Sequence, residues 1–340
     1  MRCRPVLLLI GAWLLAIQLP IRAAEAQQAT LQTCLDAAAD FSPVYPTGTF
    51  PPGTTEVSAA WALGKEDNYQ ELMGAFVAID VGPAAPANYH ITDAQMKLGE
   101  ARAGRFHLEL PRPLPAGRYR LDVTADGKPW KSVDFAVASG PPPPAALRLE
   151  DLVPLTPNRV WLYDFMQEAG AGAHVELPDI NPDADGKLRA QASYTVAEAD
   201  GAGMRIDMRR NDRVVLEEWW RLGPAGLAVT QRKVGDAMLA LEPPQTILAW
   251  PPGLRSWEWT AKDQSERQRY KMWGPLALDA PGGKRGGYLV LMRSEQPNGL
   301  VLTIERQFAS GVGMVREHTV MQLGPVTAIR QDVVLRQAGR

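Results

Sequence analysis

Residues 118–127 of this 340-residue chain read RYRLDVTADG, and this stretch indicates the fold class more clearly than any other. Its apolar side chains alternate with polar ones, which is the period-two pattern of a strand that buries one face. Asp126 and Gly127 then supply the residue pair that a type I′ hairpin turn requires. The alternation resumes over residues 133–137, so the sequence predicts a β-hairpin here.

The same alternation recurs on the N-terminal side of this hairpin. Residues 106–110 repeat it, and residues 72–81 form a longer apolar run that is typical of a further strand. About seven short strands in a segment of this size are typical of a β-sandwich. We therefore expect residues 43–138 to fold as a small all-β sandwich, preceded by an N-terminal segment at residues 27–42.

Residues 114–123, with residues 126–128 and 135–137 after them, resemble the last hairpin of bacterial immunoglobulin-like envelope domains. In that family a turn containing proline and glycine precedes a strand that bears a tyrosine, here Tyr119. The resemblance implies an immunoglobulin-like sandwich at residues 43–138 that serves as a spacer or as a protein-binding module. The cysteine pair of antibody domains is absent, so the resemblance implies no disulfide.

A proline-rich linker is predicted at residues 139–146. It contains four consecutive prolines, which cannot donate to a sheet and favour an extended polyproline II conformation. Beyond it, residues 147–336 again show strand alternation and turn pairs, with no long helical periodicity. A large antiparallel sheet must curl or close to protect its edges. We therefore expect an all-β chain whose second domain is a curved antiparallel sheet or half-barrel.

The second half also resembles a group of uncharacterised bacterial secreted proteins and lipoproteins. The resemblance rests on an opening with proline, asparagine and tryptophan, a segment with paired tryptophans, a glycine step into a strand, and a Gly-Val-Gly-Met-Val signature (residues 152–161, 251–259, 280–288 and 308–317). That group is distantly similar to the LolA-type half-barrels that carry lipoproteins in the bacterial envelope. The resemblance implies a half-barrel and an envelope location rather than a chemistry.

The first 26 residues have the features of a secretory signal peptide. Two arginines form a positive n-region, residues 6–19 form an apolar run, and residues 24–26 place small side chains where a signal peptidase cuts. The apolar run is shorter than the ~20 residues of a membrane-spanning helix. We therefore expect cleavage after Ala26, no transmembrane segment in the mature chain, and a periplasmic or extracellular location.

Charge and cysteine content exclude some classes of partner and bond. Nucleic-acid binding requires a concentrated basic face, and the formal net charge here is −2, so we expect no nucleic-acid partner. Cys3 leaves with the signal peptide, so Cys34 can form no internal disulfide. Two interpretations of Cys34 stay open: a lipid-attachment site, or an unreactive thiol in a short helix that places Leu31, Leu35 and Ala38 on the same face.

Tryptophan is the unusual feature of the second half, which holds seven of the ten in the chain. Trp219 and Trp220 are adjacent in a predicted strand, so they face opposite sides of the sheet. Trp257 and Trp259 share one face if their segment is extended. These four candidate ligand-binding residues either fill the core or grip a hydrophobic ligand, because large rigid rings bury much area at little entropic cost.

No catalytic residue, metal ligand or cofactor is predicted. The four histidines are not spaced as metal ligands, and the sequence has no Gly-x-Ser-x-Gly turn. Glu217, Glu218 and Glu258 lie beside tryptophans, where a glycosidase-type carboxylate pair is arguable. Adjacent strand residues face opposite ways, however, which favours a solvated face for these carboxylates.

The sequence therefore favours an exported, non-enzymatic envelope protein that binds a hydrophobic ligand, a lipid or a protein partner through its aromatic-rich second domain. The first alternative is an extracytoplasmic hydrolase that acts on glycan or cell-wall material. The second alternative is a structural or assembly factor that works by β-strand addition at an exposed sheet edge.

Overall fold

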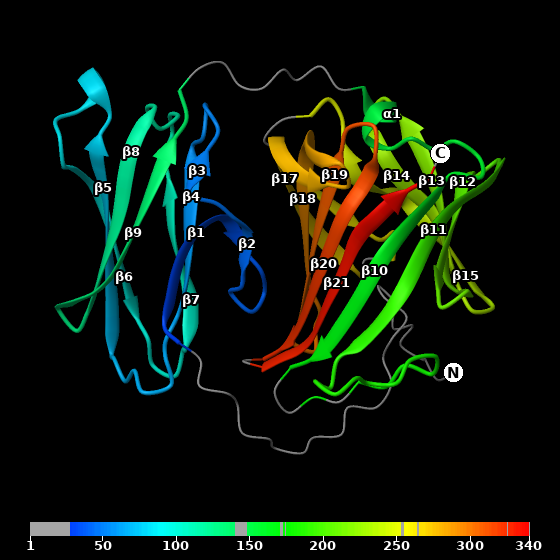
Figure 1. Cartoon of the computed structure of the whole chain (residues 1–340), viewed down its shortest axis with the longest axis horizontal. Coiled ribbons are helices and arrows are strands. Elements are labelled where there is room, and N and C mark those ends of the chain that lie inside the picture. Colours follow the sequence, from blue (N-terminus) through cyan, green and yellow to red (C-terminus); the bar gives the residue numbers. More distant parts are fainter. Residues whose placement is uncertain are drawn as a thin grey trace. The chain divides into compact units, whose positions relative to one another are not determined.

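Figure 1 shows the computed structural model, which describes residues 28–139, 148–170, 173, 175–252, 255–263, 265–324 and 326–339. The predicted all-β class is confirmed. Apart from strands, the described residues contain a single helical turn, η1 (Gly82–Ala84), and a short helix, α1 (Leu149–Leu152). Neither of these helices has the length and apolar character that crossing a membrane requires. The predicted signal peptide, and all of the predicted linker except Ser139, lie outside the described residues.

The described residues form two compact units, residues 28–139 and residues 148–339. The first unit holds two sheets, with the strand orders β2-β1-β4-β7 and β3-β9-β8-β5-β6. Neighbouring strands pair antiparallel, apart from the parallel pair β3 and β9. The strands are β1 (Thr30–Ala37), β2 (Pro43–Pro46), β3 (Thr49–Phe50), β4 (Glu56–Ala62), β5 (Glu71–Asp80), β6 (Tyr89–Lys97), β7 (Ala103–Glu109), β8 (Gly117–Ala125) and β9 (Lys128–Val137).

The predicted hairpin is confirmed as β8 and β9, which pair antiparallel on either side of Asp126 and Gly127. Both turn residues have positive φ, 48° and 75°, as a type I′ turn requires. Tyr119 on β8 is buried and stacks on Phe135 of β9, with ring centroids 5.2 Å apart. Its hydroxyl donates to the carbonyl oxygen of Pro115 at 2.5 Å. The apolar residues of the alternating pattern therefore form the core face of this sheet.

The prediction of a short helix around Cys34 is wrong. Thr30–Ala37 forms strand β1, which lies between β2 and β4 and pairs with both. A helix this short is marginal in water, whereas a strand with neighbours on both sides has its backbone polar groups paired. Cys34 is fully buried, and burial raises the pKa of its thiol to about 12. The thiol is therefore unreactive, and the first sheet begins within the predicted N-terminal segment.

The second unit is a twelve-stranded antiparallel sheet, which confirms the predicted curved sheet. Its order is β15-β14-β13-β12-β11-β10-β21-β20-β19-β18-β17-β16, so β21 joins two wings of consecutive hairpins. The strands are β10 (Val160–Ala169), β11 (Leu188–Asp200), β12 (Gly203–Arg210), β13 (Arg213–Gly223), β14 (Gly226–Val234), β15 (Ala237–Ala249), β16 (Arg255–Thr260), β17 (Arg267–Ala280), β18 (Gly283–Glu295), β19 (Leu300–Ala309), β20 (Gly313–Leu323) and β21 (Val326–Ala338).

This sheet curls until its two edge strands, β15 and β16, approach each other. The indole N–H of Trp257 donates to the carbonyl oxygen of Thr246 at 3.0 Å. The indole N–H of Trp259 donates to the carbonyl oxygen of Pro243 at 2.7 Å. Two tryptophans of β16 therefore bridge the seam of a nearly closed sheet.

The two ends of the curled sheet differ. Helix α1 lies at the end where β11 turns into β12 (Figure 1). Its two leucines are buried, and Trp161 donates its indole N–H to the carbonyl oxygen of Val312 at 2.6 Å. We call this the closed end. The opposite end carries the hairpins in which Arg210 pairs with Arg213 and Leu323 pairs with Val326, and Asp179, in the connection between β10 and β11, pairs with Arg210 there. We call it the mouth.

Candidate ligand-binding site

A cavity of about 140 Å³ lies inside the curled sheet, toward the mouth. Side chains from β10 to β14 on one wing and from β19 to β21 on the other wing line it. Eleven of the twenty lining residues are apolar or aromatic, among them Phe165, Met208 and Ile304. The remaining nine are polar or charged. A cavity that combines apolar walls with convergent polar groups is a common form of small-molecule site, and in this cavity the polar share is large.

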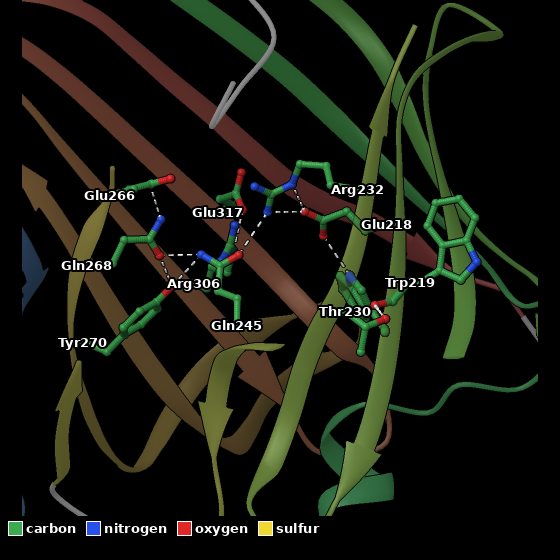
Figure 2. Close-up of polar contacts among 11 residues, drawn as sticks. Glu218, Trp219, Thr230, Arg232, Gln245, Glu266, Gln268, Tyr270, Arg306 and Glu317 are labelled. Atoms are coloured by element: carbon green, nitrogen blue, oxygen red, sulfur yellow. Dashed lines mark hydrogen bonds and ion pairs between the residues drawn. The ribbon is translucent and has the colours of Figure 1, made fainter. Parts of the chain in front are cut away.

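Two ion pairs form a charged layer in the interior. Glu218 on β13 pairs with Arg232 on β14, with 2.6 Å between Oε1 and Nη2. Arg306 on β19 pairs with Glu317 on β20, with 2.6 Å between Nε and Oε2. All four side chains are largely buried, and Figure 2 shows the two pairs close together although they come from opposite wings of the sheet.

Neutral side chains extend this layer toward the seam (Figure 2). Gln245 on β15 accepts a hydrogen bond from Arg232 at 3.2 Å and lies 3.0 Å from the hydroxyl of Tyr270. Its amide also donates to Gln268 on β17, and Gln268 donates to Glu266 at 2.5 Å. The network therefore ties β13, β14 and β15 to β17, which lies on the other side of the seam.

Burial and neighbouring charges shift the pKa values in this layer. Burial alone would raise the pKa of Glu218, but the guanidinium groups of Arg232 and Arg306 outweigh it and hold that pKa below its ordinary value. Burial alone would lower the pKa of Arg306, but the carboxylates of Glu317 and Glu218 raise it above the ordinary value. Burial raises the pKa of Glu266. Glu218 and Arg306 therefore both stay charged at neutral pH.

A third arginine contributes to the cavity lining from β12. Arg210 is 2% exposed and pairs with Asp179, to which its Nε donates at 2.8 Å. Its guanidinium also lies over the ring of Phe165, 5.1 Å from the ring centroid. The carboxylate and the aromatic face together offset the free-energy cost of burying this cation.

Gln167 on β10 differs from these paired groups. It is 1% exposed and lines the cavity, yet its amide nitrogen Nε2 has no hydrogen-bond partner among the described residues. It lies in register with Gln331 on β21, which in turn lies in register with Thr319 on β20. Three uncharged polar side chains from adjacent strands therefore form a row along one wall of the cavity. We call this row the polar ledge.

The structure brings three of the four candidate tryptophans to the inner face of the sheet. Trp220 donates its indole N–H to Glu218 at 2.8 Å, so it lies beside the charged layer. Trp257 stacks on Tyr270 with ring centroids 5.0 Å apart, and Trp259 shares its face. Trp219 points the other way, and its indole N–H donates to Asp200 at 2.6 Å. All four indole N–H groups are thus paired, and none of the four lines the cavity.

The solvated face expected for the carboxylates beside the tryptophans is wrong for Glu218, which is 4% exposed, because the alternation that turns Glu217 outward turns Glu218 into the sheet. Glu218 faces inward, whereas Glu217 pairs with Lys233 at 2.9 Å, and Glu258 pairs with Arg267 near the surface. Among the described residues, no group of three or more His, Cys, Asp or Glu side chains is placed to hold a metal ion.

Sequence reasoning missed the residues that define the interior, although a signal for them exists. On β19 the inward positions read Leu302, Ile304, Arg306 and Phe308, so a charged residue interrupts an apolar face. Gln167 interrupts the aromatic face of β10 in the same way. A polar residue at a core position of an alternating strand is an informative exception.

No protein-family model matches this chain, and no curated protein matches it. Solved structures similar to it include a candidate lipoprotein from Parabacteroides distasonis (13% identity, TM-score 0.25, covering 55% of this chain and 97% of that one). A candidate exported protein with a YmcC-like fold from Bacteroides fragilis shows 14% identity and a TM-score of 0.24, covering 54% of this chain and 98% of that one. A DUF4784 family protein from Bacteroides caccae shows 9% identity and a TM-score of 0.19, over 88% and 78% of the two chains. TM-scores this low carry no conclusion about function.

Proposed function

We propose that this protein is a non-enzymatic binding protein that works outside the cytoplasm and holds a small, largely apolar ligand inside the curled sheet. The observation that carries the proposal is the interior cavity, with its apolar lining and its buried polar layer. Buried ion pairs often stabilise a fold less than apolar residues of the same volume would. The polar interior therefore lowers the stability of the fold, and a role in ligand recognition would explain why it is present. The seam tryptophans would support the ligand by holding the sheet curled.

The volume of the cavity limits the size of the ligand. A cavity of about 140 Å³ is close to the roughly 150 Å³ engineered cavity that binds benzene, and it is smaller than the roughly 300–1,000 Å³ of pockets for drug-sized ligands. The ligand, or the part of it held inside, therefore has about six to eight carbon atoms. An intact two-chain lipid is too large to enter.

The hydrolase alternative is disfavoured by the same residues. A glycosidase of this kind needs a carboxylic acid whose pKa is raised, so that it can donate a proton at neutral pH. Glu218 and Glu317, the carboxylates that line the cavity, are each paired with an arginine, and the pKa of Glu218 is lowered. Both are therefore better suited to hold charge in place than to transfer protons.

We propose an immunoglobulin-like role as spacer or docking module for the first unit. The hydrogen bond from Tyr119 to Pro115 supports it, because a tyrosine that bonds back to the chain just upstream is typical of such sandwiches. The β-strand addition alternative is supported by strand β6, the nine-residue edge of its sheet, which is largely exposed. Capture of an envelope protein that is lost in Ile91→Pro would support strand addition, and capture that survives this change would exclude β6.

Calorimetric titration with toluene tests the binding proposal. We expect toluene to bind the mature chain with one site, and we expect Ile304→Trp to abolish binding because the indole fills the cavity. Leu162→Trp is the matched control, since Leu162 is 41% exposed on the outer face of β10. Toluene binding that is absent, or that is unchanged in Ile304→Trp, would exclude the cavity as the site.

The export part of the proposal has its own test. The mass of the protein recovered from a periplasmic or culture fraction should correspond to a chain that starts at Gln27. Recovery of the intact chain from the cytoplasm would contradict export.

A further inference from the structure

We propose that the ligand is uncharged and carries an oxygen atom that accepts a hydrogen bond from Nε2 of Gln167. This inference rests on the proposed function and specifies the ligand chemistry of the same cavity. An alcohol, a ketone or an ester with a short hydrocarbon part fits the description.

The first argument is the missing partner of Gln167. Its side chain is 1% exposed, and its amide nitrogen is buried with no acceptor in the part of the chain that the structure describes, although most buried polar groups in proteins are paired. Gln245 and Gln268, which are equally buried, have partners for their amide nitrogens. Of these three glutamines, the one whose amide nitrogen lacks a partner among the described residues is the one that lines the cavity.

The second argument is that charge is already balanced around the cavity. Each buried arginine in the lining has its own carboxylate, because Arg210 pairs with Asp179, Arg232 with Glu218 and Arg306 with Glu317. Arg209, the remaining arginine of the lining, donates to a backbone oxygen in the exposed turn at Asp212. A ligand anion at Gln167 would therefore find no unpaired buried cation, and burying an unpaired charge is costly.

The third argument is the position of the polar ledge. Gln167, Gln331 and Thr319 are uncharged and lie in register on adjacent strands. Apolar lining residues flank them, with Phe165 two residues before Gln167 on β10 and Ile304 opposite Thr319 on β19. A small ligand can thus place its oxygen at the ledge and its carbon atoms against Phe165 and Ile304.

Three probe molecules of similar size test the inference: cyclohexanone, methylcyclohexane, and cyclopentanecarboxylate at neutral pH. Each is titrated into the mature protein and into Gln167→Leu, with Gln191→Leu on the exposed outer face of β11 as the matched control. We expect Gln167→Leu to weaken cyclohexanone binding at least fivefold and to leave methylcyclohexane binding unchanged or tighter. We expect Gln191→Leu to change neither, and we expect the carboxylate to bind more weakly than the ketone.

Stability without ligand gives a second measurement. If Nε2 of Gln167 has no partner, Gln167→Leu removes an unpaired buried donor and should raise the melting temperature. A fall in melting temperature would show that the amide is satisfied within the protein and would overturn the inference. Gln167→Met repeats the test with a flexible side chain if the leucine variant does not fold.

The outcomes separate the inference from the proposed function. If cyclohexanone and methylcyclohexane both bind but Gln167→Leu affects them equally, an ordered water satisfies the amide; the cavity is then a binding site and the inference fails. Tighter binding of the carboxylate than of the ketone would also overturn it. If no probe binds and toluene does not bind either, the proposed function fails with it.

Discussion

The interiors of the two units are built from different chemistry. The largest fully buried side chains of the first unit are apolar or aromatic, and Phe76, Phe106 and Leu121 lie among them. The interior of the second unit holds three buried ion pairs and a cavity of about 140 Å³. A sandwich that only has to be stable can fill its core with apolar groups, whereas a sheet that has to accept a ligand must leave room and place polar groups within it. The difference supports the proposal that the ligand site lies in the second unit.

The largest expected effect comes from breaking one buried ion pair. Arg232→Met leaves Glu218 without its closest cation, which should lower the free energy of unfolding of the second unit by about 3 kcal/mol. Unfolding in urea, followed by tryptophan fluorescence, measures this change. The double variant Glu218→Leu with Arg232→Met should recover at least half of the loss, although the indole N–H of Trp220 loses Glu218 and the side-chain oxygen of Gln245 loses Arg232. If the double variant is no better than the single one, the cost does not come from an uncompensated charge.

The second-largest loss of stability is expected from a substitution in the densely packed core of the first unit. A Cβ atom on Gly104 would lie 2.5 Å from the ring of Trp61, which is fully buried. Gly104→Ala should therefore lower the free energy of unfolding of the first unit by about 2 kcal/mol, as overpacking does in a dense core. Hydrogen exchange measured by mass spectrometry assigns the loss to one unit. An unchanged first unit would mean that its core has more room than the structure indicates.

Acid should affect the second unit through a carboxylate on the outer face of its sheet. Burial alone would raise the pKa of Asp332, but hydrogen bonds and charge from His318 and Arg316 lower it to about 2. Because the folded-state pKa lies below the unfolded-state value, the stabilisation is complete above pH 4 and is lost as the pH falls toward 2. The loss should be roughly 2 kcal/mol.

Asp332→Asn isolates this contribution. The variant should be less stable than the parent chain at pH 6, and the difference should shrink steadily between pH 4 and pH 2. Urea unfolding at five pH values across this range measures it. A difference that is constant with pH would show that the ionisation of Asp332 is not coupled to folding.

Local patterns made the fold class predictable, but not the closure of the sheet. The Asp126-Gly127 turn and the alternation around it are encoded within 20 residues, and the structure confirms them. Strand β1 was missed because Thr33, Cys34 and Leu35 are all buried, which removes the period-two signal. Contacts between residues far apart in sequence, such as Trp161 with Val312, have no local signal at all.

The candidate site was predictable only in outline. Aromatic richness predicted a ligand site in the second unit, but residue type alone cannot separate a tryptophan that bridges a seam from one that lines a cavity. The opposite orientation of Trp219 and Trp220 followed from strand geometry. That Arg306 meets Glu218 depends on curling, because the two residues lie on opposite wings of the sheet. The polar residues on otherwise apolar strand faces were visible in the sequence and would have been the better guide.

The smallest expected effect tests whether the cavity is open space. Ala192 lines the cavity from β11, so Ala192→Val adds two methyl groups where there is room for them. Its free energy of unfolding should stay within about 0.5 kcal/mol of the parent chain or rise slightly, as cavity filling does. Gly104→Ala adds a single methyl group to the dense core of the first unit and should cost several times more. Toluene binding should weaken in Ala192→Val because the two methyl groups occupy part of the ligand volume. A loss above 1 kcal/mol would contradict the comparison, because it would mean that the second unit is packed as tightly as the first.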